Sequence, residues 1–151
     1  MNDEIKQVIV IRRKYPDGKG GFFQLRTGKL IAQAAHASMK VLLDKMIFTD
    51  ISLTQPPAKD PRFAELSMIM PKSGCLYKWL NSPFTKIVVY VDSEEELLEI
   101  KQKAEDAGIL CALVTDAGRT EFHGEATNTV VAVGPEESEK IDKITGHLKL
   151  L

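Results

Sequence analysis

Apolar and polar residues follow one another along the chain in a pattern that predicts short buried strands separated by helices. Four runs rich in β-branched residues are typical of buried strands, and they cover residues 7–11 (QVIVI), 86–91 (KIVVYV), 109–115 (ILCALVT) and 128–135 (NTVVAVGP). Helical segments are expected at 27–46, 93–108 and 136–148. Strands that alternate with helices predict an α/β fold with a largely parallel sheet covered on both faces.

Local signals mark the ends of two of these helices. Ser93 and Glu96 have the spacing of a capping box, and Gly108 stands where that helix should end. Thr27 is expected to be the N-cap of the first helix, which should run to about Met46.

Two stretches are rich in turn residues. Residues 14–21 (KYPDGKGG) leave no room for a regular element. Residues 47–80 are expected to be irregular, because Pro56, Pro57, Pro61, Pro71 and Gly74 interrupt them, with FAELSMIM as a candidate short helix.

Length and composition predict one domain that spans residues 1–151. Apolar residues make up 44% and charged residues 27%, which is ordinary for a globular protein. We find no apolar run long enough for a membrane helix and no targeting signal, so the expected location is the cytoplasm and no membrane partner is expected. Cys75, Cys111 and the three histidines have no metal-binding spacing, so neither a metal nor another cofactor is predicted.

Charge is unevenly distributed although the net charge is only −1. Residues 1–40 contain eight basic and three acidic residues, whereas residues 92–106 contain seven acidic and two basic residues. The basic segment could face an anionic partner, or both segments could be ordinary solvated surface.

Candidate chemistry gathers where the first helix begins. Lys29 stands in its first turn, where free N–H groups attract anions, and Gln33 and His36 follow on the same helical face. Alanines at 32, 34, 35 and 37 suit close packing against the sheet. The alternatives are a surface lysine at a helix end and a histidine packed against backbone groups.

A second candidate is DAGRT, residues 116–120, which leaves the third predicted strand. Asp116 could orient a water and Arg119 could bind phosphate, or the two could form an ion pair that closes the turn. Ligands of open α/β sheets bind beyond the C-terminal strand ends, where this loop and the first helix could meet. The GKGG loop is more typical of a flexible tip, and Glu94, Glu95 and Glu96 are typical of a solvated helix start.

Several segments together resemble the peptidyl-tRNA hydrolase 2 family. They are GKLIAQAAHAS, KIVVYV before an acidic helix, LVTDAGRTEF, TVVAVGP and IDKITGHLKLL, in the same order as in the family. The resemblance implies a three-layer sandwich with a mixed four-stranded, mostly parallel sheet, a homodimer, and hydrolysis of the ester that joins a peptide to the terminal ribose of tRNA, without a cofactor.

The resemblance also assigns roles to residues. It places the catalytic groups at Lys29, Asp116, Thr120 and Thr129, and His36 matches another recurrent position. Substrate contacts are expected from Gln33, His36, Arg119, Arg26 and Lys19, the basic ones holding the tRNA backbone.

Departures from the family pattern border this site. The loop over residues 14–26 is longer than usual, Thr27 replaces a lysine, the loop before Thr129 differs in length, and the segment from about 47 to 78 is enlarged. Two alternatives therefore stay open: a non-catalytic tRNA- or protein-binding module on the same fold, and a hydrolase of another nucleotide-linked ester.

Overall fold

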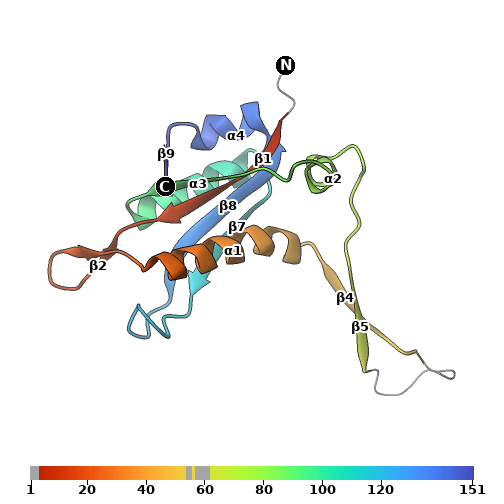
Figure 1. Ribbon diagram of the computed structural model, residues 1–151, viewed down its shortest axis with the longest axis horizontal. Helices are drawn as coiled ribbons and strands as arrows, with labels where there is room; N and C mark the ends of the chain where they lie inside the picture. The colour runs from red at the N-terminus through yellow and green to blue at the C-terminus, as the bar shows by residue number, and fades with distance from the viewer. Residues whose placement is uncertain (1–3, 54–55, 57–61) are drawn as a thin grey trace.

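A computed structural model describes residues 4–53, 56 and 62–151 and shows one mixed sheet flanked by helices (Figure 1). Within these residues the sheet has five strands in the order β7-β8-β1-β6-β9. Their bounds are β1 Ile5–Arg12, β6 Lys86–Val91, β7 Cys111–Asp116, β8 Thr127–Glu137 and β9 Lys149–Leu150. The helices are α1 Thr27–Leu43, α2 Cys75–Leu80, α3 Glu94–Asp106 and α4 Ser138–Thr145. Two small ribbons lie outside the sheet: β2 Tyr15–Pro16 with β3 Phe22–Phe23, and β4 Ile47–Ile51 with β5 Phe63–Ser67.

Strand direction corrects the expectation of a mostly parallel, four-stranded sheet. Among the described strands only β1 and β6 pair in parallel, because β8 lies between β7 and β1 and is antiparallel to both. β8 follows β7 after residues 117–126, a connection shorter than the crossover that parallel neighbours need. The strand β9 adds an antiparallel partner for β6. Because β8 reverses direction between them, β7 and β1 still point the same way, and their C-terminal ends share one edge.

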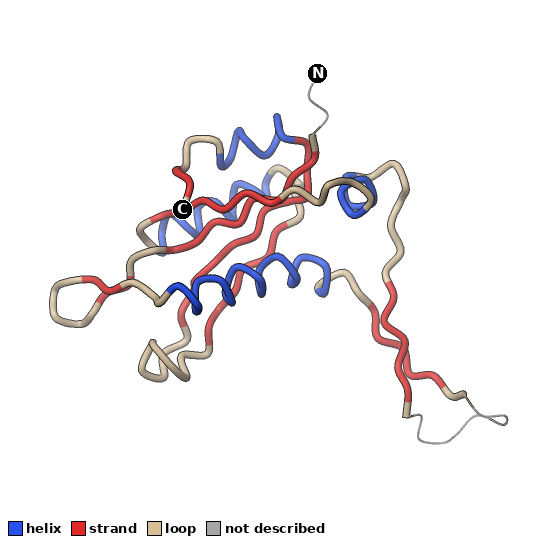
Figure 2. Tube along the Cα trace, in the orientation of Figure 1, coloured by secondary structure: helices blue, strands red, loops and turns tan. Residues whose placement is uncertain are grey.

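The apolar core lies on both faces of the sheet. Successive residues of a strand point to opposite faces. Val8 and Val10 of β1 accordingly pack with apolar residues of α3 and α4, whereas Ile9 and Ile11 pack with α1 (Figure 2). The helices thus cover β1 and β8 on both faces at the centre of the sheet.

The start of α3 follows its sequence signals, but the ends of α1 do not. The backbone N–H of Glu96 donates to Ser93 Oγ at 3.1 Å, and the Glu96 carboxylate accepts from the Ser93 N–H at 3.0 Å, which confirms the capping box. Thr27 is the first residue of α1 and not its N-cap, since Arg26 holds that position without a side-chain cap. The helix also ends at Leu43, before the expected Met46.

Residues 47–80 contain more regular structure than the sequence suggested. The β4–β5 ribbon pairs residue for residue, with Phe48 opposite Leu66, so FAELSMIM begins as a strand and not as a helix. The ribbon extends away from the body of the molecule, beyond the C-terminal end of α1 (Figure 1). Pro57 and Pro61 lie outside the described residues. In the described part of the chain, no helix combines the length and apolar character needed to cross a bilayer.

Candidate active site

The first turn of α1 meets the end of β7 at the shared strand edge. Lys29 Nζ lies 2.8 Å from Asp116 Oδ2 and donates a hydrogen bond to Thr120 Oγ1 at 2.7 Å. The side chains of Lys29 and Asp116 are only 18% and 11% exposed. Lys29 is therefore not a free surface lysine, and three of the four residues that the family resemblance places as catalytic lie together. We call Lys29, Asp116 and Thr120 the polar cluster.

Asp116 is held by donors on several sides. The backbone N–H of Gly118 donates to Oδ1 at 2.7 Å, and Gln33 Nε2 donates to Oδ2 at 2.7 Å. Burial alone would raise the pKa of Asp116, but the hydrogen bonds from Lys29, the Gly118 N–H and Gln33 outweigh it and hold the pKa below its ordinary value. The side chain is therefore a carboxylate at neutral pH.

Gly118 makes this turn possible. Its φ is +80°, and a Cβ at this position would lie 2.3 Å from the carbonyl oxygen of Glu125. Both the backbone conformation and the close approach require glycine. In this conformation the N–H of Gly118 points toward Asp116 and donates to it.

A buried hydrogen bond extends the network to β8. Thr129 is fully buried, and its Oγ1 donates to Gln33 Oε1 at 2.7 Å. Because the Gln33 oxygen accepts from Thr129, its amide nitrogen is directed at Asp116. Thr129 therefore reaches the polar cluster only through Gln33.

Four residues expected at the site are exposed around it or apart from it. Lys19, Arg26, His36 and Arg119 are all exposed. Arg26 Nε pairs with Glu121 Oε1 at 3.1 Å. Arg119 makes no hydrogen bond or ion pair with the described residues, so the alternative Asp116–Arg119 pair does not form and Lys29 takes its place.

His36 and the GKGG loop differ from what was expected. His36 is solvent-exposed and makes no hydrogen bond with described residues; it lies about 10 Å further along α1 than Lys29. It is thus neither part of the polar cluster nor packed against backbone. In the loop, the backbone N–H groups of Lys19 and Gly21 both donate to Asp17 Oδ1, at 2.7 and 2.9 Å, so they are not directed at a phosphate.

The alanines of α1 also divide between two environments. Ala37 is fully buried and Ala34 packs against the core, in agreement with close packing on the sheet. Ala32 and Ala35, in contrast, are exposed on the outer side of the helix. The small residues therefore shape an outer surface as well as the contact with the sheet.

A cavity of about 440 Å³ adjoins the polar cluster. Its apolar part is formed by Tyr15, Phe23 and Phe122, whose rings pack against one another. Phe122 connects it with the cluster, since Lys29 Nζ lies 5.6 Å from the ring centroid. The cavity is large enough for part of a small ligand.

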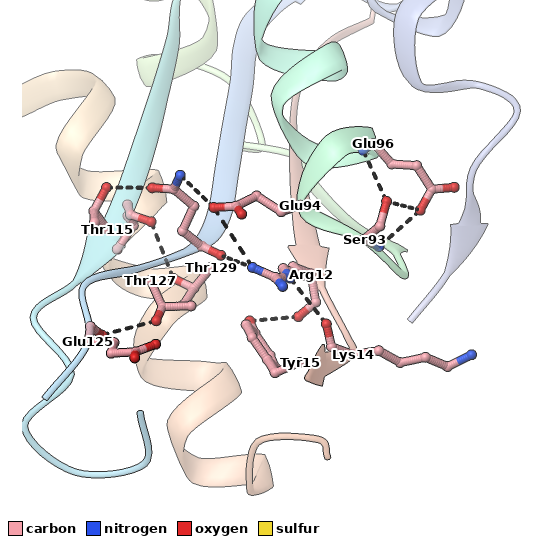
Figure 3. A network of polar contacts seen from close by, with 12 residues as sticks. Arg12, Lys14, Tyr15, Ser93, Glu94, Glu96, Thr115, Glu125, Thr127 and Thr129 are labelled. Carbon is pink, nitrogen blue, oxygen red and sulfur yellow. Dashed lines mark hydrogen bonds and ion pairs between the residues drawn. The ribbon is translucent and has the colours of Figure 1, made fainter. Parts of the chain in front are cut away.

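Arg12 and Glu94 line the same cavity, in a network that sequence reasoning missed (Figure 3). The guanidinium of Arg12 is buried, donating from Nε to the Lys14 carbonyl at 3.1 Å and from Nη1 to the Asn128 carbonyl at 3.4 Å. Glu94 accepts from Asn128 Nδ2 at 2.9 Å and lies 3.9 Å from Arg12 Nη1. Glu94 is therefore more than a solvated helix start, and Arg12 belongs to the interior. The only sequence signal was the position of Arg12 at the end of a buried strand.

One group of potential metal ligands occurs among the described residues, away from the polar cluster. Cys75, Glu136 and Glu137 offer ligand atoms within 4.8 Å of one another. The Cys75 thiol donates to Glu136 at 3.1 Å, and Lys140 pairs with both carboxylates. Burial and Glu136 raise the pKa of the thiol, so these groups satisfy one another as a protonated thiol, two carboxylates and an ammonium.

The fold and the polar cluster define an α/β protein with an ammonium, a carboxylate and a hydroxyl at the edge formed by the C-terminal ends of β1 and β7. Such a set of groups suits an enzyme that orients water and stabilises an oxyanion. The chain belongs to the peptidyl-tRNA hydrolase PTH2 family, whose model matches residues 5–151.

Individual relatives agree with this assignment. The chain is 39% identical to a peptidyl-tRNA hydrolase of Methanocaldococcus jannaschii over 97% of this chain and 100% of that protein. It is 35% identical to a peptidyl-tRNA hydrolase of Methanococcus maripaludis, over 97% of this chain and 98% of the relative. A probable peptidyl-tRNA hydrolase 2 of Drosophila melanogaster is 34% identical over 100% of this chain and 64% of that protein.

Proposed function

We propose that the polar cluster is the place where this chain hydrolyses the ester bond between a peptide and the terminal ribose of tRNA. Membership of the PTH2 family gives the reaction, and the proposal assigns residues to it. The proposal rests on the position of Lys29 Nζ, which lies 2.8 Å from Asp116 Oδ2 and 2.7 Å from Thr120 Oγ1 beside the C-terminal ends of β1 and β7.

In this proposal Asp116 orients the attacking water. Its lowered pKa keeps the carboxylate ionised, so it accepts a hydrogen bond from the water and attracts its proton as the new C–O bond forms. The water oxygen adds to the ester carbonyl carbon, and the carbonyl oxygen becomes an oxyanion. The bond to the ribose oxygen then breaks, and that oxygen takes up the proton that Asp116 attracted, which releases tRNA. The second proton of the water leaves to solvent when the new peptide carboxyl group ionises.

Lys29 stabilises the oxyanion, with the N-terminal turn of α1 adding partial positive charge. Thr120 accepts a hydrogen bond from Lys29 and so holds the ammonium in place. Gln33 and Thr129 act as positioning residues, because Gln33 directs Asp116 and buried Thr129 directs Gln33.

The rest of the substrate lies around the cluster. The exposed basic residues Lys19, Arg26 and Arg119 bind the tRNA backbone, so binding weakens as salt is added. The ester is flanked by the peptide on one side and by the terminal nucleoside of tRNA on the other. The cavity beside Phe122 receives one of these two groups. We place the protein in the cytoplasm, where peptidyl-tRNA arises, and we propose that it acts as a homodimer.

The test is release of free tRNA from an N-acetylated aminoacyl-tRNA, comparing the unmodified chain with Asp116→Asn. The substitution keeps the shape and removes the charge, and we expect a loss in kcat of at least about 100-fold. Asp44→Asn, at an exposed carboxylate on the other end of α1 that pairs with Lys40, is the matched control and should leave kcat unchanged. Full turnover by Asp116→Asn would remove this residue from the mechanism. Salt-sensitive tRNA binding without any turnover by the unmodified chain would instead favour a binding module.

A further inference from the structure

The β4–β5 ribbon, which we call the arm (residues 47–51 and 63–67), exposes large apolar side chains to solvent. Ile47 is 60% exposed, Phe48 70%, Phe63 53% and Leu66 44%. The arm extends away from the remainder of the fold (Figures 1 and 2). An isolated two-stranded ribbon is marginally stable in water, so an arm of this composition is expected to be covered.

Apolar residues lie on both faces of the arm. Phe48 is directly opposite Leu66, and Ile51 is opposite Phe63. Directly opposed residues share a face and neighbouring residues alternate, which places Phe48 and Leu66 on one face and Ile47 and Phe63 on the other. Contact on both faces is typical of a segment that inserts into a partner.

A groove that the arm could fill runs along one flank of α1, between this helix and the sheet at β1 and the start of β6. It has a volume of about 410 Å³ and is lined by Ile9, Ala34, Ala35, Met39, Leu42 and Phe84, together with Ser38 and Lys86. Ala34 and Ala35 are small and leave room for a bulky neighbour. Met39 and Phe84 at the groove, and Ile31 and Leu43 further along the same helix, are 39–65% exposed.

We propose that the arm of one chain packs into the α1 groove of a second copy, and that the second copy returns the same contact. The exchange is reciprocal, so it closes into a two-fold dimer and leaves no free end for further chains. It goes beyond the proposed function, since it uses none of the residues of the polar cluster. It gives the proposed homodimer a specific interface.

Length and area suit this partner. A five-residue strand spans about 17 Å, and the part of α1 that lines the groove, from Ala34 to Leu42, rises about 12 Å, so one strand of the arm is long enough to cover the whole groove. Large apolar side chains carry roughly 200 Å² each, so the eight half-exposed ones named here offer on the order of 800 Å² per chain, the amount that each partner buries in a standard interface.

Position and charge argue against two other partners for the arm, namely the groove of its own chain and a nucleic acid. The arm leaves α1 at its C-terminal end and points away from its own groove, which prevents packing within one chain (Figure 1). The two strands of the arm carry Asp50 and Glu65 and no basic residue, so the arm does not suit a nucleic acid. The groove offers the opposite charge, with Lys86 and no acidic residue in its lining.

Sedimentation equilibrium of the full chain tests the proposal. At tens of micromolar the unmodified chain should have about twice the chain mass of 16.8 kDa. Phe48→Glu in the arm and Ala35→Glu in the groove should each give monomers. Leu98→Glu, at an apolar residue of α3 that is 39% exposed, is the matched control and should remain dimeric.

Mixing the two variants separates a broken interface from a misfolded chain. Phe48→Glu keeps an intact groove and Ala35→Glu keeps an intact arm, so an equimolar mixture should form dimers through one intact contact, more weakly than the unmodified chain. A monomeric unmodified chain would overturn the proposal, as would a dimer that survives Phe48→Glu or two variants that fail to combine. Sedimentation reports on the arm and the groove, whereas the turnover assay reports on Lys29 and Asp116. Failure of the proposed interface can therefore be told apart from failure of the proposed hydrolytic site.

Discussion

Thr129 offers a sharp test of how the polar cluster is held, because it is fully buried and yet connected to Asp116 through Gln33. In Thr129→Val the shape is nearly kept, but the hydroxyl that donates to Gln33 Oε1 is lost. The Gln33 oxygen is then buried without its donor, which costs on the order of 2 kcal/mol of stability. For a chain of this size that lowers Tm by roughly 4–8 °C.

The same change should reduce turnover without weakening substrate binding. Gln33 can rotate once its oxygen is released, and Asp116 then loses a donor that fixes its orientation. Misplacement of a catalytic group by about 1 Å can cost a factor of about 100, so we expect kcat to fall roughly 10- to 100-fold. KM should stay unchanged, since Thr129 does not reach the surface.

Thermal unfolding and steady-state hydrolysis of N-acetylated aminoacyl-tRNA measure the two effects. Thr129→Ser keeps the hydroxyl and should restore most of the activity. In a Gln33→Leu background, Thr129→Val should add little further loss, because the two residues act in series. A raised KM with unchanged kcat, or an equal loss in both backgrounds, would show that Thr129 acts on the substrate directly and would refute the positioning role.

Three other predictions concern the end of β7 and the loop that follows it. Gly118→Ala should destabilise the protein by about 2 kcal/mol or more, measured by urea unfolding, because φ is +80° and the new Cβ would meet the Glu125 carbonyl; a neutral effect would contradict the rigidity of this turn. The pKa of Asp116 is lowered by folding, so its stabilising contribution is complete above its unfolded pKa of about 3.9 and is lost as the pH falls through its lower folded pKa. The acid limb of kcat against pH that belongs to Asp116 should therefore lie below about pH 4, and a limb near pH 6 would point to another group. Arg119→Ala should reduce the slope of log binding constant against log salt by about 1, whereas an unchanged slope would exclude a phosphate contact.

The sequence predicted the parts of the fold that depend on local pattern. The capping box of Ser93 and Glu96 is formed as expected, because it depends only on residues within one turn. Strand direction was not predictable in this way. β8 lies between β7 and β1 because it follows β7 after a short loop, and the apolar run of β8 has the same appearance in a parallel or an antiparallel sheet.

For the candidate site, residue types were more informative than spacing. Lys29 could be picked out because a lysine in a first helical turn opposes the helix dipole, and Asp116 because a strand end can present a carboxylate to a water, whereas the role of Thr120 came from the family resemblance. The link between Gln33 and Thr129 joins residues 96 positions apart, and no local pattern reports it. Arg12 was only one of the eight basic residues counted in the segment 1–40, because the sequence alone does not show that it contacts the Tyr15 ring and the Asn128 carbonyl.

The central claim is that Lys29 and Asp116 form the hydrolytic site, and Lys29→Met tests it most directly. Lys40→Met is the matched control, since Lys40 lies on the same helix and pairs with Asp44 at 2.8 Å, as Lys29 does with Asp116. Single-turnover release of tRNA from N-acetylated aminoacyl-tRNA should fall at least about 100-fold in Lys29→Met, as expected for loss of an oxyanion donor, and should stay unchanged in Lys40→Met. Equal rates for the unmodified chain and Lys29→Met would contradict the account and place the chemistry elsewhere in the molecule.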